Sequence, residues 1–199
     1  MLSFKDNIQK RIFDIVLSVL AISLGWWLIV IAWLVATIET KSNGMFIQKR
    51  IGRRGKPFFV YKIKTMKPMD EITTTVTTSK DSRITKSGTF FRKMKIDELP
   101  QLFNVLLGEM SFVGPRPDVS GYADKLVGED AIILSLRPGI TGPASLKYKN
   151  EEDLLAQQKD PEGYNRETIW PDKVKINKMY LQNWSLKKDI VYIMRTIVG

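Results

Sequence analysis

The chain has 199 residues, enough for one domain with an accessory element but not comfortably for two domains. Lysine and arginine number 31 against 21 acids, and the formal net charge of +10 favours nucleic acid, anionic lipid or a phosphorylated substrate as partner. Cysteine and histidine are both absent, which excludes disulfides, thiolate nucleophiles and the commonest general base. Any catalysis must use carboxylates, lysine, arginine, hydroxyl groups or a hard cation held by oxygen.

The first predicted element is an apolar helix over residues 15–38, a stretch without a single charge. At ~1.5 Å per residue a straight helix of this length would measure roughly 36 Å, enough to cross a bilayer. A signal peptide is not expected, because the run is too long and no small-residue cleavage site follows it. A buried core helix is the alternative to a membrane segment.

Basic residues flank this segment on both sides, with Lys10 and Arg11 before it and nine lysines and arginines between residues 40 and 67. Such flanks favour the cytoplasmic side, so both ends are expected there. The predicted topology is a re-entrant helix that bends near residues 23–25 and returns. A spanning helix remains the alternative, because Gly25 weakens a helix by only about 1 kcal/mol. Residues 1–40 are the predicted membrane unit, and residues 41–199 the predicted cytoplasmic catalytic domain.

A β-hairpin is predicted next, from the runs "MFIQKR" and "FFVYKIKTM" joined by "IGRRGKP". Gly52 and Gly55 can supply the positive φ angles that its turn requires. The threonine-rich residues 73–78 are polar and β-prone, and predict either an edge strand or a mobile loop.

The central motif is "KIDELPQLFNVLLGEMSFVGPRP", which begins at Lys95. Its apolar residues from Leu99 onward recur at i, i+3, i+4 and i+7, on one face of a helix. Pro100 is tolerated only in the first turn, so this helix is expected to begin near Asp97 or Glu98.

The remainder of the chain is punctuated by glycine and proline. "FVGPRP" and "RPGITGP" predict tight loops rather than strands. Residues 150–158 predict a short helix, residues 160–165 a turn, and residues 172–198 a helix. This last helix suits either a membrane surface or packing on its own domain.

The adjacent carboxylates of Asp97 and Glu98 have two interpretations. Acids at a helix N-terminus are stabilised by the helix dipole by ~0.3–1 kcal/mol, which would make the pair a structural feature. Arg92, Arg116 and Arg137 favour a functional one, since arginines held in rigid loops grip phosphate bidentately. Carboxylates beside such arginines fit phosphoryl transfer with Mg²⁺. In a chain without histidine or cysteine, aspartate is also the natural covalent nucleophile.

The chain resembles the bacterial sugar transferases, the monotopic phosphoglycosyl transferases that start membrane-linked glycan assembly. The resemblance covers nearly the whole chain and is carried by "FIQKRIGRRGKPFFVYKIKTM", "DSRITKSGTFFRKMKIDELPQLFNVLLGEMSFVGPRP" and "RPGITG". It implies a small mixed α/β cytoplasmic domain with an N-terminal re-entrant membrane helix and interfacial amphipathic helices. The implied location is the cytoplasmic face of the bacterial inner membrane.

The family moves a phospho-sugar from a UDP-sugar to polyprenol phosphate, releases UMP, and passes through a covalent aspartyl intermediate with ping-pong kinetics. By resemblance, Asp97 is the nucleophile and contacts Mg²⁺, and Glu98 completes the dyad. The implied partners are the UDP-sugar, polyprenol phosphate and anionic membrane lipid, with no nucleic acid. The residues expected to bind substrate are Lys62, Arg92, Pro115, Arg116, Pro117, Arg137 and Gly139.

Two departures from the family pattern are visible. Many members have Ser-Pro at the membrane break, whereas this chain has Ser23-Leu24 followed by Gly25. Many also continue "RPGITG" with Trp-Ala-Gln-Val and Asn-Gly-Arg, whereas this chain reads "PASLKYKNEED", a segment expected to bear on sugar choice.

Two other functions compete with the transferase. A non-enzymatic basic module on lipid or nucleic acid accounts for the charge but not for carboxylates beside arginine loops. An aspartyl phosphatase would be expected to carry an Asp-x-Asp pattern at its nucleophile, and this chain lacks that pattern. The sequence does not specify the sugar, the polyprenol length, the glycan or the oligomeric state.

Overall fold

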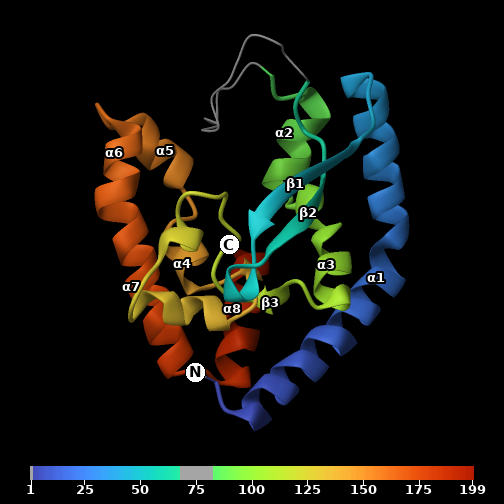
Figure 1. The fold of residues 1–199 in the computed structure, drawn as a ribbon. Coiled ribbons are helices and arrows are strands. Elements are labelled where there is room, and N and C mark those ends of the chain that lie inside the picture. The colour runs from blue at the N-terminus through green and yellow to red at the C-terminus, as the bar shows by residue number, and fades with distance from the viewer. Residues whose placement is uncertain (1, 68–82) are drawn as a thin grey trace.

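A long helix runs along one side of a small mixed helix-and-strand domain, as Figure 1 shows for this computed structural model. The structure describes residues 2–67 and 83–199, so the strand or loop predicted at 73–78 lies outside the described residues. The strands are β1 (Met45–Ile51), β2 (Pro57–Ile63), β3 (Ser111–Val113) and β4 (Gly139–Thr141). The α-helices are α1 (Phe4–Thr40), α2 (Lys86–Lys93), α3 (Gln101–Leu107), α4 (Pro143–Lys147), α5 (Glu151–Ala156), α6 (Pro161–Tyr164), α7 (Trp170–Gln182) and α8 (Leu186–Val198).

Helix α1 contains the whole apolar run and is hydrogen-bonded without interruption through residues 23–25. Ser3 caps it, because the Ser3 hydroxyl accepts from the backbone N–H of Asp6 at 3.1 Å. Figure 1 shows that the axis of α1 changes direction part-way along its length. The predicted weak point is therefore compatible with a continuous, curved helix rather than a broken one.

The domain covers α1 in two stretches, residues 10–18 and 29–40, and within each a buried residue recurs every three or four positions. The opposite face exposes apolar side chains, among them Trp26 and Trp27, each more than half exposed. The buried residues of α1 are Lys10, Asp14, Ser18, Ile29, Ala32, Ala36 and Thr40.

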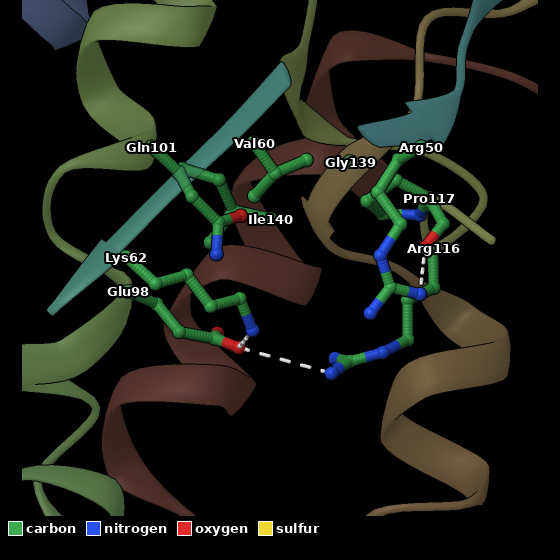
Figure 2. A pocket seen from close by; sticks show the side chains of 9 residues that line it. All are labelled: Arg50, Val60, Lys62, Glu98, Gln101, Arg116, Pro117, Gly139 and Ile140. Atoms are coloured by element: carbon green, nitrogen blue, oxygen red, sulfur yellow. Dashed lines mark hydrogen bonds and ion pairs between the residues drawn. The ribbon is translucent and has the colours of Figure 1, made fainter. Parts of the chain in front are cut away.

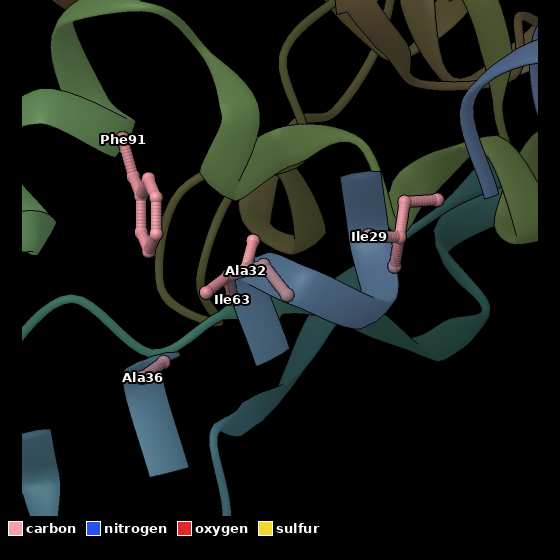
Figure 3. Packing of buried hydrophobic residues seen from close by; sticks show 5 residues of the cluster. All are labelled: Ile29, Ala32, Ala36, Ile63 and Phe91. Atoms are coloured by element: carbon pink, nitrogen blue, oxygen red, sulfur yellow. The ribbon is translucent and has the colours of Figure 1, made fainter. Parts of the chain in front are cut away.

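Both ends of α1 contact the same domain. Near its start, Arg11 donates from both Nη atoms to the backbone oxygens of Val105 and Leu106, at 2.6 and 2.8 Å, at the end of α3. Near its end, Ala32 and Ala36 pack with Ile63 of β2 and Phe91 of α2 (Figure 3). The small alanine side chains let the backbone of α1 approach β2 closely. The two halves of α1 thus hold different parts of one domain.

The predicted hairpin is confirmed: β1 and β2 pair antiparallel, from Met45 opposite Ile63 to Ile51 opposite Pro57. The prediction for its turn was half wrong. Gly55 has a positive φ of 71°, but Gly52 is extended, and Arg54 takes the second positive φ of 59°.

The loops predicted at "FVGPRP" and "RPGITGP" contain two short strands, which corrects the prediction. Strands β3 and β4 pair in parallel, with Ser111 opposite Gly139. Glycine permits this approach. A Cβ on Gly114 would collide with the backbone oxygen of Arg137, and a Cβ on Gly139 with the backbone nitrogen of Gly114.

The helix predicted near Asp97 begins as a 3₁₀ turn over Ile96–Glu98, and the regular helix α3 starts at Gln101, directly after Pro100. The short helix predicted at 150–158 is confirmed by α5. The turn predicted at 160–165 is wrong, because Asp160 caps a helix there: its Oδ1 accepts from the N–H of Gly163 at 2.9 Å.

The single helix predicted at 172–198 is two helices, α7 and α8. They are separated at residues 183–185, where Ser185 is extended and caps α8 by accepting from the N–H of Lys188 at 3.3 Å. A serine cap in mid-segment is the local signal for this break.

A buried polar cluster joins α8, α7 and the start of α1. The Nζ of Lys10 lies 2.6 Å from Oδ2 of Asp189 and 3.2 Å from the hydroxyl of Tyr180. The same carboxylate accepts from Tyr180 at 2.6 Å and from Trp184 Nε1 at 3.0 Å. Because each charge here is paired and hydrogen-bonded, burial of the ions is tolerated, and the C-terminal helices are fixed to α1.

Candidate active site

The adjacent acids lie in the turn between α2 and α3. Lys95, with a positive φ of 57°, reverses the chain after α2 and directs Asp97 and Glu98 into the domain. Neither carboxylate caps a helix: Pro100 occupies the N-cap position of α3, which has no side-chain cap. Both acids lie in the first turn of the 3₁₀ helix, so the dipole interpretation and the functional interpretation both remain open at this point.

Glu98 forms one wall of a small pocket, shown in Figure 2. Its Oε1 lies 2.8 Å from the Nζ of Lys62 on β2 and 3.9 Å from Nη2 of Arg116 on the opposite side. The residues that line the pocket are Arg50, Val60, Lys62, Glu98, Gln101, Arg116, Pro117, Gly139 and Ile140.

Two cations keep Glu98 ionised. Burial acts to raise the pKa of this carboxyl, but the charges of Lys62 and Arg116 and the hydrogen bond from Lys62 outweigh it. The pKa of Glu98 falls to about 2. At neutral pH this carboxylate is an anion that holds the two cations on either side of the pocket.

Asp97 has the opposite electrostatic environment. Burial raises its pKa, the neighbouring charge of Glu98 raises it further, and Lys62, Lys95 and Arg92 offset only part of the effect. The resulting pKa of Asp97 is about 6. The carboxylate is thus mostly ionised at neutral pH but more basic than an ordinary aspartate, a difference typical of functional sites.

Asp97 does not itself line the pocket, although its sequence neighbour Glu98 does. The Oδ1 of Asp97 is buried and has no hydrogen-bond partner among the residues that the structure describes. A buried carboxylate oxygen without a partner is costly, so a ligand or ion that fills the position is favoured.

The donor set at this position fits Mg²⁺ shared with a substrate. Within residues 2–67 and 83–199, no group of three His, Cys, Asp or Glu side chains gathers into a self-sufficient metal site. Mg²⁺ does not require one, because it is commonly held by one or two carboxylates together with substrate phosphates and water. Asp97 would supply the carboxylate, since Glu98 is engaged by Lys62.

Arg116 is held by a rigid frame at the pocket mouth. Pro115 and Pro117 flank it, and the backbone oxygen of Pro115 accepts from the N–H of Gly139 at 2.8 Å. The Arg116 side chain is 49% exposed and reaches into the pocket (Figure 2), where its guanidinium is free to meet a phosphate.

Three of the residues expected to bind substrate, Arg92, Pro115 and Arg137, do not line the pocket. Arg92 is near Asp97 but outside the pocket lining, and its Nη2 lies 3.2 Å from Oε1 of Glu152 on α5. Arg137 donates from Nε to the backbone oxygen of Gly108 at 2.8 Å, at the far end of α3. The structure therefore brings Lys62, Arg116, Pro117 and Gly139 to Glu98 but does not bring Arg137 to them.

Sequence reasoning missed two charged residues beside Arg116. Arg50 donates to the backbone oxygen of Pro117 at 3.3 Å and to Gln48 Oε1 at 2.6 Å. Burial raises the pKa of Asp118 to about 6, despite the nearby charges of Lys173 and Arg50. For Asp118, the sequence offered one signal, its position directly after Pro-Arg-Pro. For Arg50 it offered none, because nothing distinguishes this arginine from its basic neighbours.

Residues 5–199 match the family model described as bacterial sugar transferase. The chain belongs to the bacterial sugar transferase family. It is 34% identical, over 98% of its length, to a UDP-glucose:undecaprenyl-phosphate glucose-1-phosphate transferase of Xanthomonas campestris pv. campestris. It is 33% identical, over 96% of its length, to a protein of the same description from Caulobacter vibrioides.

A third relative is the putative undecaprenyl-phosphate N-acetylgalactosaminyl 1-phosphate transferase of Bacillus subtilis, 39% identical over 60% of this chain. The matched region spans 40% of the Xanthomonas protein, 69% of the Caulobacter protein and 68% of the Bacillus protein. These relatives are named for different sugars, so membership of the family leaves the sugar of this chain open.

The pKa of Asp97 gives a testable titration. In protein freed of divalent ions by a chelator, the Asp97 carboxyl should titrate with a midpoint near pH 6 in ¹³C NMR, assigned with Asp97→Asn. Lys62→Met removes a charge that lowers this pKa, so the midpoint should move to higher pH. Lys64→Met is the matched control, because Lys64 bonds Ser42 instead, at 2.9 Å. A midpoint near pH 4 in the unmodified protein would contradict the electrostatic description.

Proposed function

We propose that this chain transfers a phospho-sugar from a UDP-sugar to polyprenol phosphate, with release of UMP, through a covalent intermediate on Asp97. The observation that carries the proposal is the basic, unpartnered carboxylate oxygen of Asp97 beside a pocket lined by Lys62 and Arg116. The names of the relatives support the substrate classes, a nucleotide sugar and undecaprenyl phosphate.

In the first half-reaction, an oxygen of Asp97 attacks the phosphorus that bears the sugar. A bond forms between this oxygen and the attacked phosphorus while the bond from that phosphorus to the bridging oxygen breaks, and UMP leaves with the bridging oxygen and the electron pair. In the second, an oxygen of polyprenol phosphate attacks the same phosphorus, and Asp97 leaves as a carboxylate. Each substrate thus visits the site in turn, which suits a soluble donor and a membrane acceptor.

The main obstacle to the first step is repulsion between Asp97 and the anionic diphosphate. At ~4 Å each pair of unit charges costs about 4 kcal/mol at an effective dielectric of about 20. Lys62 and Arg116 offset this cost at the pocket, and Arg92 adds a positive charge from the side of α2. Mg²⁺ held by Asp97 and the phosphates would neutralise charge on the diphosphate when bound.

Glu98 has a positioning task in this mechanism. A carboxyl with a pKa of about 2 does not carry a proton at neutral pH, so it is unsuited to act as a general acid. Its ion pair with Lys62 aims the ammonium group at the pocket, and its attraction to Arg116 limits where the guanidinium lies.

Association with the cytoplasmic face of the inner membrane is part of the proposal. The exposed face of α1 is apolar, and its mean hydropathy and length suffice for membrane insertion. Because both ends of α1 contact one domain, a helix that crosses the bilayer would have to leave one of these contacts behind. A re-entrant or surface-embedded α1 keeps both.

The covalent intermediate has a direct test. Enzyme mixed with a UDP-sugar and Mg²⁺, without acceptor, should release up to about one equivalent of UMP and gain a phospho-sugar mass on the peptide that contains Asp97. Asp97→Asn should do neither, whereas Asp130→Asn, which alters an exposed acid paired with Lys178, should do both. UMP release that requires polyprenol phosphate, with no trapped adduct, would favour direct transfer in a ternary complex. If no UMP is released even when the UDP-sugar and polyprenol phosphate are both present, a non-enzymatic role is favoured.

The frame around Arg116 predicts a loss on a conservative substitution. Arg116→Lys keeps the charge but loses the fork that holds phosphate with two bonds, so kcat/KM should fall roughly 10- to 100-fold. The melting temperature should stay within a few degrees, because the side chain is half exposed. Arg166→Lys, in a surface pair with Glu167, is the control. An unchanged kcat/KM would mean that Arg116 does not bind the phosphate.

Topology can be tested with single cysteines, since the chain has none of its own. Cysteines at Ser3 and at Ser42 flank α1 and should show the same accessibility to a membrane-impermeant thiol reagent in intact cells. A cysteine at the exposed Lys159 reports the side of the catalytic domain. If Ser3 and Ser42 label oppositely, α1 spans the membrane and the re-entrant topology is wrong.

A further inference from the structure

Helix α1 carries two carboxylates that bind separate parts of the domain. Asp14 lies just before the apolar run and Glu39 just after it, and neither takes part in the chemistry described above. Figure 1 shows that the parts they bind, β3 and α2, lie toward opposite ends of α1. Each part leads directly into one group of site residues.

Asp14 is 1% exposed and holds β3. Its Oδ1 accepts from the hydroxyl of Ser111 at 3.0 Å and from the backbone N–H of Phe112 at 3.1 Å. Both donors meet the same carboxylate oxygen, so Asp14 holds the start of β3 from the side of α1.

The chain between β3 and Arg116 transmits this position with little freedom. The N–H of Gly114 donates to the backbone oxygen of Thr141 at 2.9 Å, and Pro115 accepts from Gly139 at 2.8 Å. The proline ring fixes the backbone φ just before Arg116. A shift of β3 therefore moves Arg116 with it.

Glu39 holds the start of α2. Its two carboxylate oxygens each lie 3.3 Å from the backbone nitrogen of Ser87, and its Oε2 also accepts from the Ser87 hydroxyl. The far end of α2 carries Arg92, followed by the turn with Asp97. Because α2 is short and buries Phe91 against α1, a displacement at its start is passed on to Arg92.

We propose that Asp14 and Glu39 are positioning residues through which α1 sets the two sides of the site, Asp14 acting through β3 on Arg116 and Glu39 through α2 on Arg92. The distance between the two arginines then depends on the shape of α1, and so on how this helix lies in its surroundings. This inference rests on the proposed transferase function, because its readout is the transfer reaction.

Ser18 lies on the same buried face of α1 as Asp14 but makes no such connection. Ser18 donates to the backbone oxygen of Ile15 in its own helix, at 3.0 Å, and connects α1 to no site element. Ser18→Ala is therefore a matched control that removes a buried hydroxyl from the same face without altering either connection.

The test is a crossed set of double-mutant cycles. Asp14→Ala and Glu39→Ala are each combined with Arg116→Ala and with Arg92→Ala, and kcat/KM for UMP release from a radiolabelled UDP-sugar is measured. Each single carboxylate variant should lose roughly 10- to 100-fold, the effect of a misplaced binding group. Asp14→Ala should cost nothing further in the Arg116→Ala background but its full factor with Arg92→Ala, and Glu39→Ala should show the reverse pattern.

A conservative replacement provides the rescue. Asp14→Asn keeps an oxygen acceptor for β3 and should recover most of the activity, and Ser18→Ala should retain it fully. If Asp14→Ala does not fold, Ser111→Ala takes its place in the same cycles, since it removes one of the two donors to Asp14.

The outcomes separate the two proposals. If the unmodified enzyme releases no UMP, the proposed function fails. If it does, but the Asp14 and Glu39 variants keep full activity, the positioning inference is wrong. It is equally wrong if each variant loses the same factor in both arginine backgrounds, because a general loss of structure would act in that way.

Discussion

The site depends on how two neighbouring acids share one buried space. Two carboxylates next to each other in sequence and shielded from water cannot both be stabilised as anions without cations nearby. The ion pair between Lys62 and Glu98, at 2.8 Å, gives that stabilisation to Glu98. Asp97 is left with a pKa of about 6 and an oxygen without a partner. Two cations placed closer to Glu98 than to Asp97 thus make two otherwise similar side chains chemically different.

That ion pair requires β2 and α3 to be held in register, and a fully buried asparagine does this. Asn104 on α3 accepts from the N–H of Tyr61 at 3.2 Å and donates to the backbone oxygen of Phe59 at 2.7 Å. These bonds fix the strand on both sides of Val60, which packs with Val105 and Met110. Lys62, one residue beyond Tyr61, is thereby set opposite Glu98. The polar contact orients the two elements, and the apolar contacts hold them together.

Patterns within short stretches of sequence predicted the elements whose stabilising contacts lie within the same stretch. The hairpin has two alternating strands and a glycine-rich turn, and α3 has an apolar face that is visible in sequence. The parallel pair of β3 and β4 was not predictable in this way, because each strand is very short and their pairing depends on glycines that meet only in the folded chain. The site shows the same division. The dyad and the Pro-Arg-Pro frame were visible as motifs, but the position of Arg137 at the end of α3 depends on tertiary contacts that no motif encodes.

The contact between the two glycine-containing loops has a consequence for engineering. Gly114 and Gly139 meet backbone to backbone, so this contact contains no side chains. It therefore cannot adjust by a change of rotamer when a neighbouring residue is replaced. The position of the loop that holds Arg116 is therefore set by contacts between backbones rather than by side chains that a neighbouring substitution could repack. A library of substitutions elsewhere in these loops would leave this backbone contact intact. Substitutions at either glycine would instead alter the scaffold that every such variant shares.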